Sequence, residues 1–566
     1  MDKTGAEILI DALIQEDVEV IFGYPGGVLI PIFDALYDAD KIQVVLSRHE
    51  QGAAHAADGY ARVTGRPGVC MATSGPGATN LITGIATAYL DSIPMIAITG
   101  QVASPMLGTD AFQEVDAVGI TRSITKHNFL VKSVEELPSV MKKAFHIAST
   151  GRPGPVHIDI PKDVSTAVMK GYSYPEEVSM RSYKPNVSAH ERQIKRAAAA
   201  IEAAEKPLIY AGGGIIISGA HEELKMVAEK INAPVTTTFM GLGGFPETHD
   251  LFLGMPGMHG SKAANYALQE TDLIISVGAR FDDRVTGNVE TFAPNAKIVH
   301  MDIDPAAISK IIKVDIPVVG DAKDALTKLF KRLKSKKRNG WNETVQAWKK
   351  DGIYRYEKSD KVVKPQYVIQ RLYEKTKGDA VIATEVGQNQ MWAAQYYYFD
   401  KPRRFLSSGG LGTMGYGMPA AMGAAFAFGG KKDVYDIAGD GSIQMNIQEL
   451  ATIANHKLPV KVVILNNRYL GMVRQWQELF FDKRYSSTCL SDDSECGKCA
   501  GPKPECGDYV PDFIKLAESY GICGYRAKKA SEVEEVLDKG INTQGPVILE
   551  FMVPPEENVF PMVPAG

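Results

Sequence analysis

The stretch Tyr435–Gly471, "YDIAGDGSIQMNIQELATIANHKLPVKVVILNNRYLG", decides the fold of the region around it. An apolar strand runs into Gly439-Asp440-Gly441, and a second strand, "VKVVIL", runs into Asn466-Asn467. The intervening residues, 442–465, leave room for a helix and a return strand, so the two strands are predicted to be parallel. Both polar ends then meet at the carboxyl edge of one sheet, where open α/β folds bind ligands.

The polar groups at this edge suit a magnesium ion. Asp440 and the side-chain oxygen of Asn467 are hard ligands, and Mg²⁺ shares its shell with substrate phosphates. Glycine lets the backbone approach a phosphate closely. We expect a backbone carbonyl at Tyr469, two diphosphate oxygens and a water to complete the octahedron. The alternative is two unrelated strand ends with turn chemistry, which would suffice for a bare GDG.

The same strand-and-helix rhythm recurs along the rest of the chain. It predicts α/β domains at 1–165, 190–335 and 365–566, each a doubly wound parallel sheet. A polar linker follows the first, and the charged stretch from Lys331, "KRLKSKKRNG", is interpreted as a solvated helix end and linker. Three domains fit 566 residues at about 150 residues per domain.

Composition excludes several function classes. Hydrophobic residues make up 45% and charged residues 23%, as in ordinary globular proteins. A net charge of -5 argues against nucleic acid or an anionic membrane as partner. No run approaches the roughly 18 apolar residues of a membrane span. The amphipathic N-terminus predicts a first helix and not a signal peptide. Six cysteines are too few for a disulfide scaffold, so a cytoplasmic location is expected.

GDG, some two dozen residues and then NN together form the signature of thiamin diphosphate enzymes, which the chain resembles over essentially its whole length. It is most similar to the catalytic large subunits of the biosynthetic acetohydroxyacid synthase, or acetolactate synthase, family. The matching strings include "GYPGG", "RHEQGAAHAADGYAR", "SGPGATN", "GRPGPVHIDIPKD", "RFDDRVTG", "GLGTMGYG" and "GMVRQWQ". The resemblance implies a pyruvate oxidase/decarboxylase-like architecture: a pyrimidine-binding domain, an FAD-binding-like domain and a diphosphate- and Mg²⁺-binding domain.

The resemblance also implies an activity. The enzyme would decarboxylate pyruvate and ligate the two-carbon unit to pyruvate or 2-ketobutyrate. The products would be 2-acetolactate or 2-aceto-2-hydroxybutyrate, for branched-chain amino-acid synthesis. It implies a homodimer or homotetramer with sites at subunit interfaces, and the family usually has a regulatory small subunit. The alternatives are a pyruvate oxidase-like enzyme, an FAD-free fermentative synthase, a glyoxylate-ligating relative lacking the activating carboxylate, and a non-catalytic nucleotide-binding scaffold.

Site residues carry over from the matched strings. Glu50 matches the family's activating glutamate, which drives the cofactor's aminopyrimidine into its imino form. Asn389 departs from the family, whose diphosphate loop usually reads GQHQ; asparagine can still donate a hydrogen bond. The expected catalytic residues are Glu50, Gln113 and Lys162; the thiamin diphosphate contacts are Gly26, Glu50, Gly387, Gln388, Asn389, Met414, Gly439, Asp440, Gly441 and Ser442; the FAD contacts are Arg152, Gly212, Gly213, Gly214, His259, Arg280, Asp302 and Asp321; and the second-substrate pocket contains Arg284 and Trp476.

One segment, 489–510, is not explained by the family pattern. It contains Cys489, Cys496, Cys499 and Cys506, spaced Cys-x₆-Cys-x₂-Cys-x₆-Cys, in an insertion of loop composition. Four thiolates could order such a loop by binding a structural Zn²⁺ tetrahedrally. A redox pair, an iron–sulfur cluster and free cysteines on a disordered loop are the alternatives.

Overall fold

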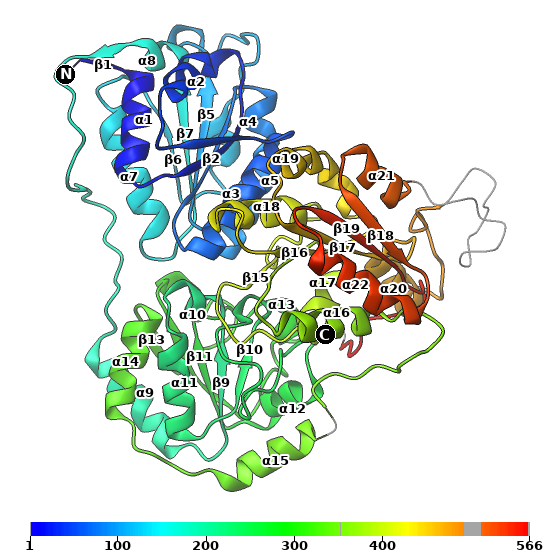
Figure 1. Cartoon of the computed structure of the whole chain (residues 1–566). Helices are drawn as coiled ribbons and strands as arrows, with labels where there is room; N and C mark the ends of the chain where they lie inside the picture. Colours follow the sequence, from blue (N-terminus) through cyan, green and yellow to red (C-terminus); the bar gives the residue numbers. More distant parts are fainter. Residues whose placement is uncertain (1, 351, 492–510, 564–566) are drawn as a thin grey trace.

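A computed structural model describes residues 2–350, 352–491 and 511–563. Three parallel sheets, each flanked by helices, confirm the predicted α/β fold class (Figure 1). Within the described ranges, no helix combines the length and apolar character needed to cross a bilayer.

The first domain is a parallel sheet in the order β3-β2-β4-β5-β7-β6. Its strands are β2 (Val20–Tyr24), β3 (Gln43–Leu46), β4 (Gly68–Ala72), β5 (Met95–Gln101), β6 (His127–Leu130) and β7 (Pro155–Pro161). Its helices are α1 (Gly5–Gln15), α2 (Ile30–Tyr37), α3 (Glu50–Thr64), α4 (Pro76–Asn80), α5 (Ile82–Asp91), α6 (Ala117–Thr121), α7 (Leu137–Ser149) and α8 (Lys162–Thr166). A short antiparallel pair, β1 (Lys3–Thr4) with β8 (Val168–Met169), joins the two ends of the domain.

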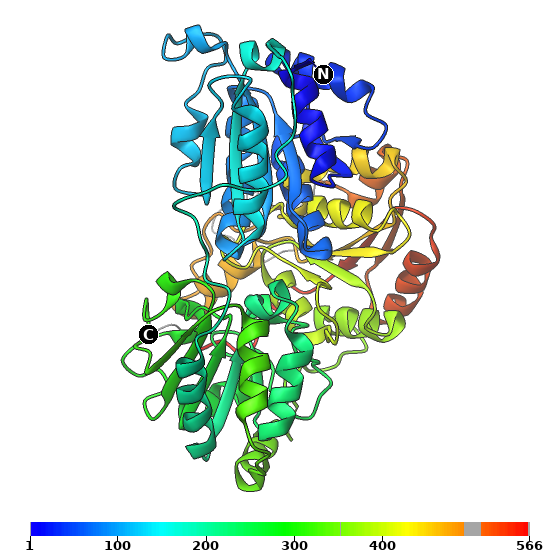
Figure 2. The same cartoon turned by 90° about the vertical axis from the view of Figure 1, so that its left-hand side faces the viewer.

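The central domain repeats the pattern in the order β10-β9-β11-β12-β13. Its strands are β9 (Pro207–Ala211), β10 (Val235–Thr237), β11 (Leu273–Val277), β12 (Lys297–Asp302) and β13 (Ile316–Val319). Its helices are α9 (Glu191–Ala203), α10 (Gly213–Ile217), α11 (His221–Ile231), α12 (Lys262–Glu270), α13 (Asp283–Thr286), α14 (Ala322–Arg332) and α15 (Asn339–Lys349). Figure 2 shows this domain below the other two.

The last domain has the sheet order β15-β14-β16-β17-β19-β18. Its strands are β14 (Val381–Thr384), β15 (Phe405–Leu406), β16 (Val434–Gly439), β17 (Val460–Asn466), β18 (Cys523–Ala527) and β19 (Val547–Met552). Its helices are α16 (Pro365–Thr376), α17 (Gln388–Tyr396), α18 (Gly417–Ala427), the 3₁₀ helix η5 (Ile443–Glu449), α19 (Leu450–Asn455), α20 (Gly471–Phe480), α21 (Phe513–Ser519) and α22 (Val533–Asn542).

The first and last sheets have the same connectivity, because numbering the strands of each along the chain gives the order 2-1-3-4-6-5 in both. The second strand therefore lies on one side of the first strand, and the third and fourth strands lie on its other side. This change of side opens a crevice outside the carboxyl ends of the first and third strands, where ligands bind in doubly wound folds. The crevice of the last domain lies between β14 and β16.

Helices α3 and α18 join the first and last domains (Figure 1). Side chains from both domains form one continuous apolar cluster, which includes Phe22 and Ala57 on one side and Met418 and Met422 on the other. The two helices approach closely because glycines lie at their contact. A Cβ at Gly59 of α3 would stand 2.1 Å from the carbonyl oxygen of Ala420 in α18. The two domains are therefore packed as one body.

Candidate active site

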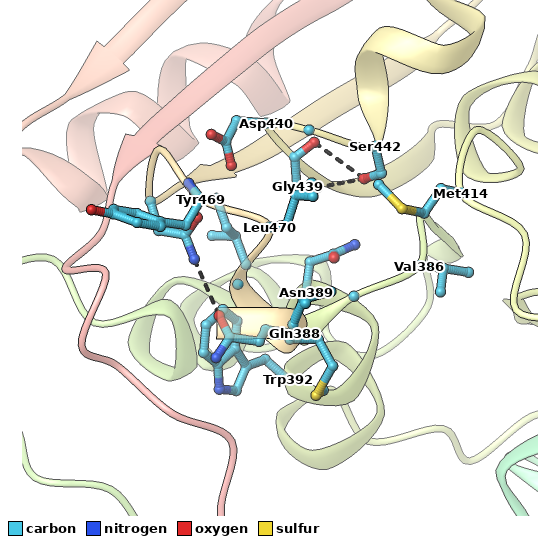
Figure 3. A pocket seen from close by; sticks show the side chains of 17 residues that line it. Val386, Gln388, Asn389, Trp392, Met414, Gly439, Asp440, Ser442, Tyr469 and Leu470 are labelled. Carbon is cyan, nitrogen blue, oxygen red and sulfur yellow. Dashed lines mark hydrogen bonds between the residues drawn. The ribbon is translucent and has the colours of Figure 1, made fainter. Parts of the chain in front are cut away.

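A pocket lies at the crevice of the last domain (Figure 3). Its walls are the loops that follow β14, β16 and β17, together with Met414. It is lined by Val386, Gly387, Gln388, Asn389, Trp392, Met414, Gly439, Asp440, Gly441, Ser442, Leu465, Asn467, Tyr469, Leu470, Gly471, Met472 and Val473. Every residue predicted to hold the diphosphate or Mg²⁺ from this domain is in that set.

Asp440 and Asn467 meet because β16 and β17 are parallel neighbours, with Gly439 opposite Leu465. Asp440 is 1% exposed and Asn467 is 6% exposed. The Asn467 amide is held at both ends: its Nδ2 donates to Gln388 Oε1 at 3.1 Å, and its Oδ1 accepts from the Tyr469 N–H at 3.0 Å. An amide oxygen has a second lone pair, which can coordinate a cation.

The pocket's charge pattern fits a diphosphate carried by a divalent ion. Helices α17 and α20 both begin at its wall, and helix N-termini favour anions. None of the described lining residues is a lysine or arginine, whereas Asp440 brings a negative charge. A diphosphate beside this carboxylate needs a cation between the two, and hard oxygen ligands suit Mg²⁺. The residues present therefore fit the Mg²⁺–diphosphate pair.

The side-chain amide of Asn389 is already engaged by the protein. Its Nδ2 donates to the carbonyls of Glu385 at 3.0 Å and Ile437 at 2.7 Å, which ties the start of α17 to β16. A Cβ at Gly439 would stand 3.3 Å from Asn389 Oδ1, so the amide oxygen faces the loop of Gly439. In this structure Asn389 braces two walls of the pocket through its nitrogen.

A buried carboxyl group anchors the loop that carries Met414. Glu385 accepts hydrogen bonds from the Gly415 N–H at 2.6 Å and the Met418 N–H at 3.2 Å. Burial raises the pKa of Glu385 to about 7, against the lowering effect of these donors. Asn446 adds a bond from its Nδ2 to the Gly415 carbonyl at 2.7 Å. Met414 is thus presented to the pocket by a loop that is fixed from two sides.

A second group of predicted residues lies at the carboxyl edge of the first sheet. The Glu50 carboxylate accepts from Asn80 Nδ2 at 2.9 Å, and a Cβ at Gly77 would stand 3.4 Å from Glu50 Oε1. A Cβ at Gly26 would stand 2.4 Å from the Cβ of Thr73, in the loop after β4. Glu50 does not line the pocket of the last domain in its own chain.

Gln113 and Lys162 belong to the same edge of the first sheet. Gln113 has a φ of 59°, in the left-handed region, and a Cβ at Gly75 would stand 2.9 Å from its carbonyl oxygen. Lys162 directly follows β7, begins α8 and is exposed. The predicted catalytic residues thus lie on the first domain, and none of them lines the pocket of the last domain.

The predicted flavin residues gather mainly at the carboxyl edge of the central sheet. Gly212, Arg280 and Asp302 follow or end the adjacent strands β9, β11 and β12. A Cβ at Gly212 would stand 2.3 Å from the Gly278 carbonyl oxygen, and the Gly214 N–H donates to that oxygen at 3.0 Å. Close packing of the start of α10 against Gly278, which directly follows β11, therefore explains Gly212 and Gly214 without a ligand.

The remaining predicted flavin residues bring other parts of the chain to the central domain. Arg152 reaches from the first domain to Asp304, with 3.3 Å between Nη1 and Oδ2. Asp321 caps α14, accepting from the N–H groups of Lys323 and Asp324. The carbonyl of His259 accepts from Gln395 Nε2 in the last domain at 3.0 Å.

Arg284 and Trp476, the predicted second-substrate residues, lie on different domains, and neither lines the pocket of the last domain. The segment from Val559 to Val563 forms hydrogen bonds close to both residues. Next to Trp476, Gln475 donates to the Val559 carbonyl at 3.0 Å. The Val563 N–H donates to the Met258 carbonyl at 2.8 Å, and the Met258 N–H donates to the Arg284 carbonyl at 2.8 Å.

Of the cysteine stretch, Cys496, Cys499 and Cys506 lie outside the described residues. Cys489 stands opposite Tyr469 in an isolated antiparallel bridge, and the Leu490 N–H donates to the Arg468 carbonyl at 2.9 Å. The start of the insertion thus lies against the pocket loop. Among the described residues, no three His, Cys, Asp or Glu side chains form a metal-binding group.

Sequence reasoning missed several residues that build the site. Gln475 accepts from Gln388 Nε2 at 2.9 Å, and Trp392 and Leu470 line the pocket. Asn80, which donates to Glu50, is the last residue of the quoted string "SGPGATN". Its side-chain amide within a matched string was the signal that could have identified it. Gln475 stands likewise in "GMVRQWQ", beside the chosen Trp476.

Comparison with known proteins gives the following matches. Residues 3–120, 194–329 and 385–551 match the N-terminal TPP binding domain, central domain and C-terminal TPP binding domain of the thiamine pyrophosphate enzymes, thiamine pyrophosphate being thiamin diphosphate. The chain is 50% identical to a probable acetolactate synthase large subunit of Methanocaldococcus jannaschii, over 99% of this chain and 94% of that protein. It is 49% identical to the acetolactate synthase large subunit of Corynebacterium glutamicum (100% and 89% covered) and 47% identical to the isozyme 3 large subunit of Escherichia coli (99% and 96%).

Proposed function

We infer the activity from the premise that this chain belongs to the thiamine pyrophosphate enzymes, in their acetolactate synthase large-subunit family. The chain is the catalytic subunit of a carboligase that forms 2-acetolactate from two molecules of pyruvate. The observation that supports this function is that Asp440 and Asn467 line one pocket together with the starts of α17 and α20.

Thiamin diphosphate supplies the carbon nucleophile and the electron sink needed to remove CO₂ from a 2-keto acid. The protein's part is to hold and activate it. We propose that Asp440, Asn467 and the Tyr469 carbonyl hold Mg²⁺, and that the N-termini of α17 and α20 face the diphosphate. We propose that Glu50, steadied by Asn80, hydrogen-bonds the ring nitrogen of the aminopyrimidine.

We propose a homodimer in which Glu50 of one copy serves the diphosphate pocket of the other. The supporting observation is that Glu50 does not line the pocket of its own chain. Large apolar side chains are also exposed around the two crevices: Ile30 at 64%, Phe112 at 87% and Met445 at 52%. If these side chains form one contiguous patch in the assembled molecule, they would mark an association surface. Sedimentation velocity on the purified chain tests this, and a monomer with full activity would contradict it.

The remaining cofactors and partners are proposals as well. FAD would bind at the carboxyl edge of the central sheet, and its loss on acid treatment should be visible by absorbance. The relatives are named large subunits, which supports a separate small subunit. A structural zinc at the four cysteines is tested by elemental analysis, with Cys496→Ser and Cys499→Ser as controls. A cytoplasmic location and use of 2-ketobutyrate as second substrate stay predictions.

The decisive assay measures acetolactate from pyruvate with purified protein, thiamin diphosphate, Mg²⁺ and FAD. Acetyl phosphate or acetate in its place would favour the oxidase alternative. Glu50→Gln should lower kcat by about 100-fold or more, the usual worth of a placed acid or base. Diphosphate binding should persist, because Glu50 is not a predicted ligand of Mg²⁺. A variant that kept most of its turnover would contradict the role of Glu50.

A further inference from the structure

The turn between β3 and α3 presents Glu50, and it is held by the last domain of the same chain. Glu449 Oε1 accepts from the Arg48 N–H at 2.9 Å and from the His49 N–H at 3.0 Å. Arg48 and His49 directly precede Glu50, the first residue of α3. We propose that Glu449 is a positioning residue that sets the place of Glu50 at the cofactor, an inference that rests on the proposed function.

A glycine leaves space for the Glu449 carboxylate. Glu449 is fully buried, and a Cβ at Gly52 would stand 2.5 Å from its Oε1. Gly52 lies in the first turn of α3, so any side chain there would push Glu449 off the turn. Helix α3 runs from Glu50 to Thr64, and the positive end of a helix dipole stabilises an adjacent carboxylate. Two backbone donors, a glycine gap and the helix dipole thus converge on one group.

A second bond from the same segment holds the other end of the turn. The Thr452 hydroxyl donates to the carbonyl of Leu46, the last residue of β3, at 3.0 Å. Glu449 and Thr452 therefore fix both sides of the segment that leads into Glu50. Asn80 bonds the carboxylate of Glu50, whereas Glu449 and Thr452 bond the backbone of the turn that precedes Glu50.

Because the Glu449 carboxylate is buried, it needs the hydrogen bonds that the turn donates. Burial raises the pKa of Glu449 to about 7, and the N–H groups of Arg48 and His49 act in the opposite direction. A buried carboxylate without donors is costly, so these bonds are strongly favoured whenever the group is ionised. The arrangement resists small displacements of the turn.

The position of Glu449 also links it to the predicted metal loop. It ends η5, the helix that directly follows Gly439-Asp440-Gly441-Ser442. One short segment thus leads from the diphosphate loop to the residue that holds Glu50. In the proposed dimer these two ends belong to different active sites, so Glu449 connects the two sites through a single chain.

The test compares Glu449→Ala, Glu449→Gln and Glu247→Ala, a control that removes a buried carboxyl from the central domain. The readouts are kcat, thiamin diphosphate affinity, the unfolding midpoint, and the exchange rate of the bound cofactor's C2 proton. Glu449→Ala should lower C2 exchange and kcat by about 10- to 100-fold, because displacements of about 1 Å cost rates of this order. Cofactor affinity should change far less. Glu449→Gln should recover most of the loss, since its amide oxygen can accept the same hydrogen bonds.

A double-mutant cycle separates positioning from a general loss of stability. If Glu449 acts through Glu50, Glu449→Ala should add little further loss of C2 exchange in the Glu50→Gln background. An equal loss in both backgrounds, or normal exchange in Glu449→Ala, would overturn the proposal. Should Glu449→Ala fail to fold, Thr452→Val gives a milder test expected to move in the same direction. Failure of the wild-type chain to make acetolactate would instead overturn the proposed function, while its C2 exchange could still be compared.

Discussion

Replacing Gly59 by alanine should separate the helices that join the first and last domains. Gly59 lies inside α3, and its missing side chain lets α18 approach. The added methyl carbon would stand 2.1 Å from the carbonyl oxygen of Ala420 and 2.7 Å from its carbonyl carbon. These are backbone atoms, which cannot rotate aside as a side chain can. The helices must therefore move apart by about 1.3 Å, the shortfall between 2.1 Å and an ordinary contact of 3.4 Å.

Two opposing effects decide the size of the change. Alanine is favoured over glycine within a helix by about 1 kcal/mol, whereas overpacking a closed interface costs about 1–3 kcal/mol. Overpacking should win here, because the reciprocal contact is equally tight: a Cβ at Gly423 would stand 1.9 Å from the Ala56 carbonyl oxygen. We expect a net destabilisation of up to about 2 kcal/mol. Because α3 begins at Glu50, kcat should fall as well.

The measurement is urea unfolding of Gly59→Ala beside Gly340→Ala. Gly340 is a matched control, since it is helical and exposed, with no atom within 4 Å of an added Cβ. Gly340→Ala should be neutral or slightly stabilising. A chain of several domains need not unfold in two states, so the first transition midpoint is compared. A Gly59→Ala protein as stable and active as Gly340→Ala would refute the argument from close helix packing.

Further predictions concern the site and the domain interface. Asp440→Ala should weaken Mg²⁺-dependent thiamin diphosphate binding by about tenfold or more, since losing a contact to a charged group costs about 1.5–3 kcal/mol; calorimetric titration with unchanged affinity would contradict this. Trp476→Leu should shift products towards 2-acetolactate when pyruvate and 2-ketobutyrate compete, with about 1–3 kcal/mol at stake for one methylene; an unchanged product ratio would assign the ring to packing. Arg62→Met should destabilise the chain by about 3–5 kcal/mol, because it leaves two buried carboxylates, Asp58 at 2.6 Å and Asp91 at 2.8 Å, without their cation; an unaltered unfolding midpoint would argue against this network.

The central strands could be predicted because they are mostly apolar runs ending in glycine or polar residues. Strands β16 and β17 are fully buried apart from Gly439, and their spacing required a parallel pair. The edge strands β6 and β18 carry a weaker signal in the sequence. Both are largely half-buried, with polar residues such as His127 and Arg526, so they lack the apolar pattern of a central strand.

The sequence by itself determined the α/β class and placed Asp440 and Asn467 at one edge of a sheet. Asp440 and Asn467 follow neighbouring strands, so local order along the chain was enough to bring them together. Only the tertiary structure decided how Glu50 is held. Glu449 lies some 400 positions from Arg48 and His49, and no local pattern pairs residues so far apart. The tertiary structure also showed that the amide nitrogen of Asn389 donates to two backbone carbonyls. These hydrogen bonds depend on how α17 packs against β16. Periodicity and turn chemistry fix contacts between chain neighbours, whereas contacts between domains depend on packing that forms only when the whole chain folds.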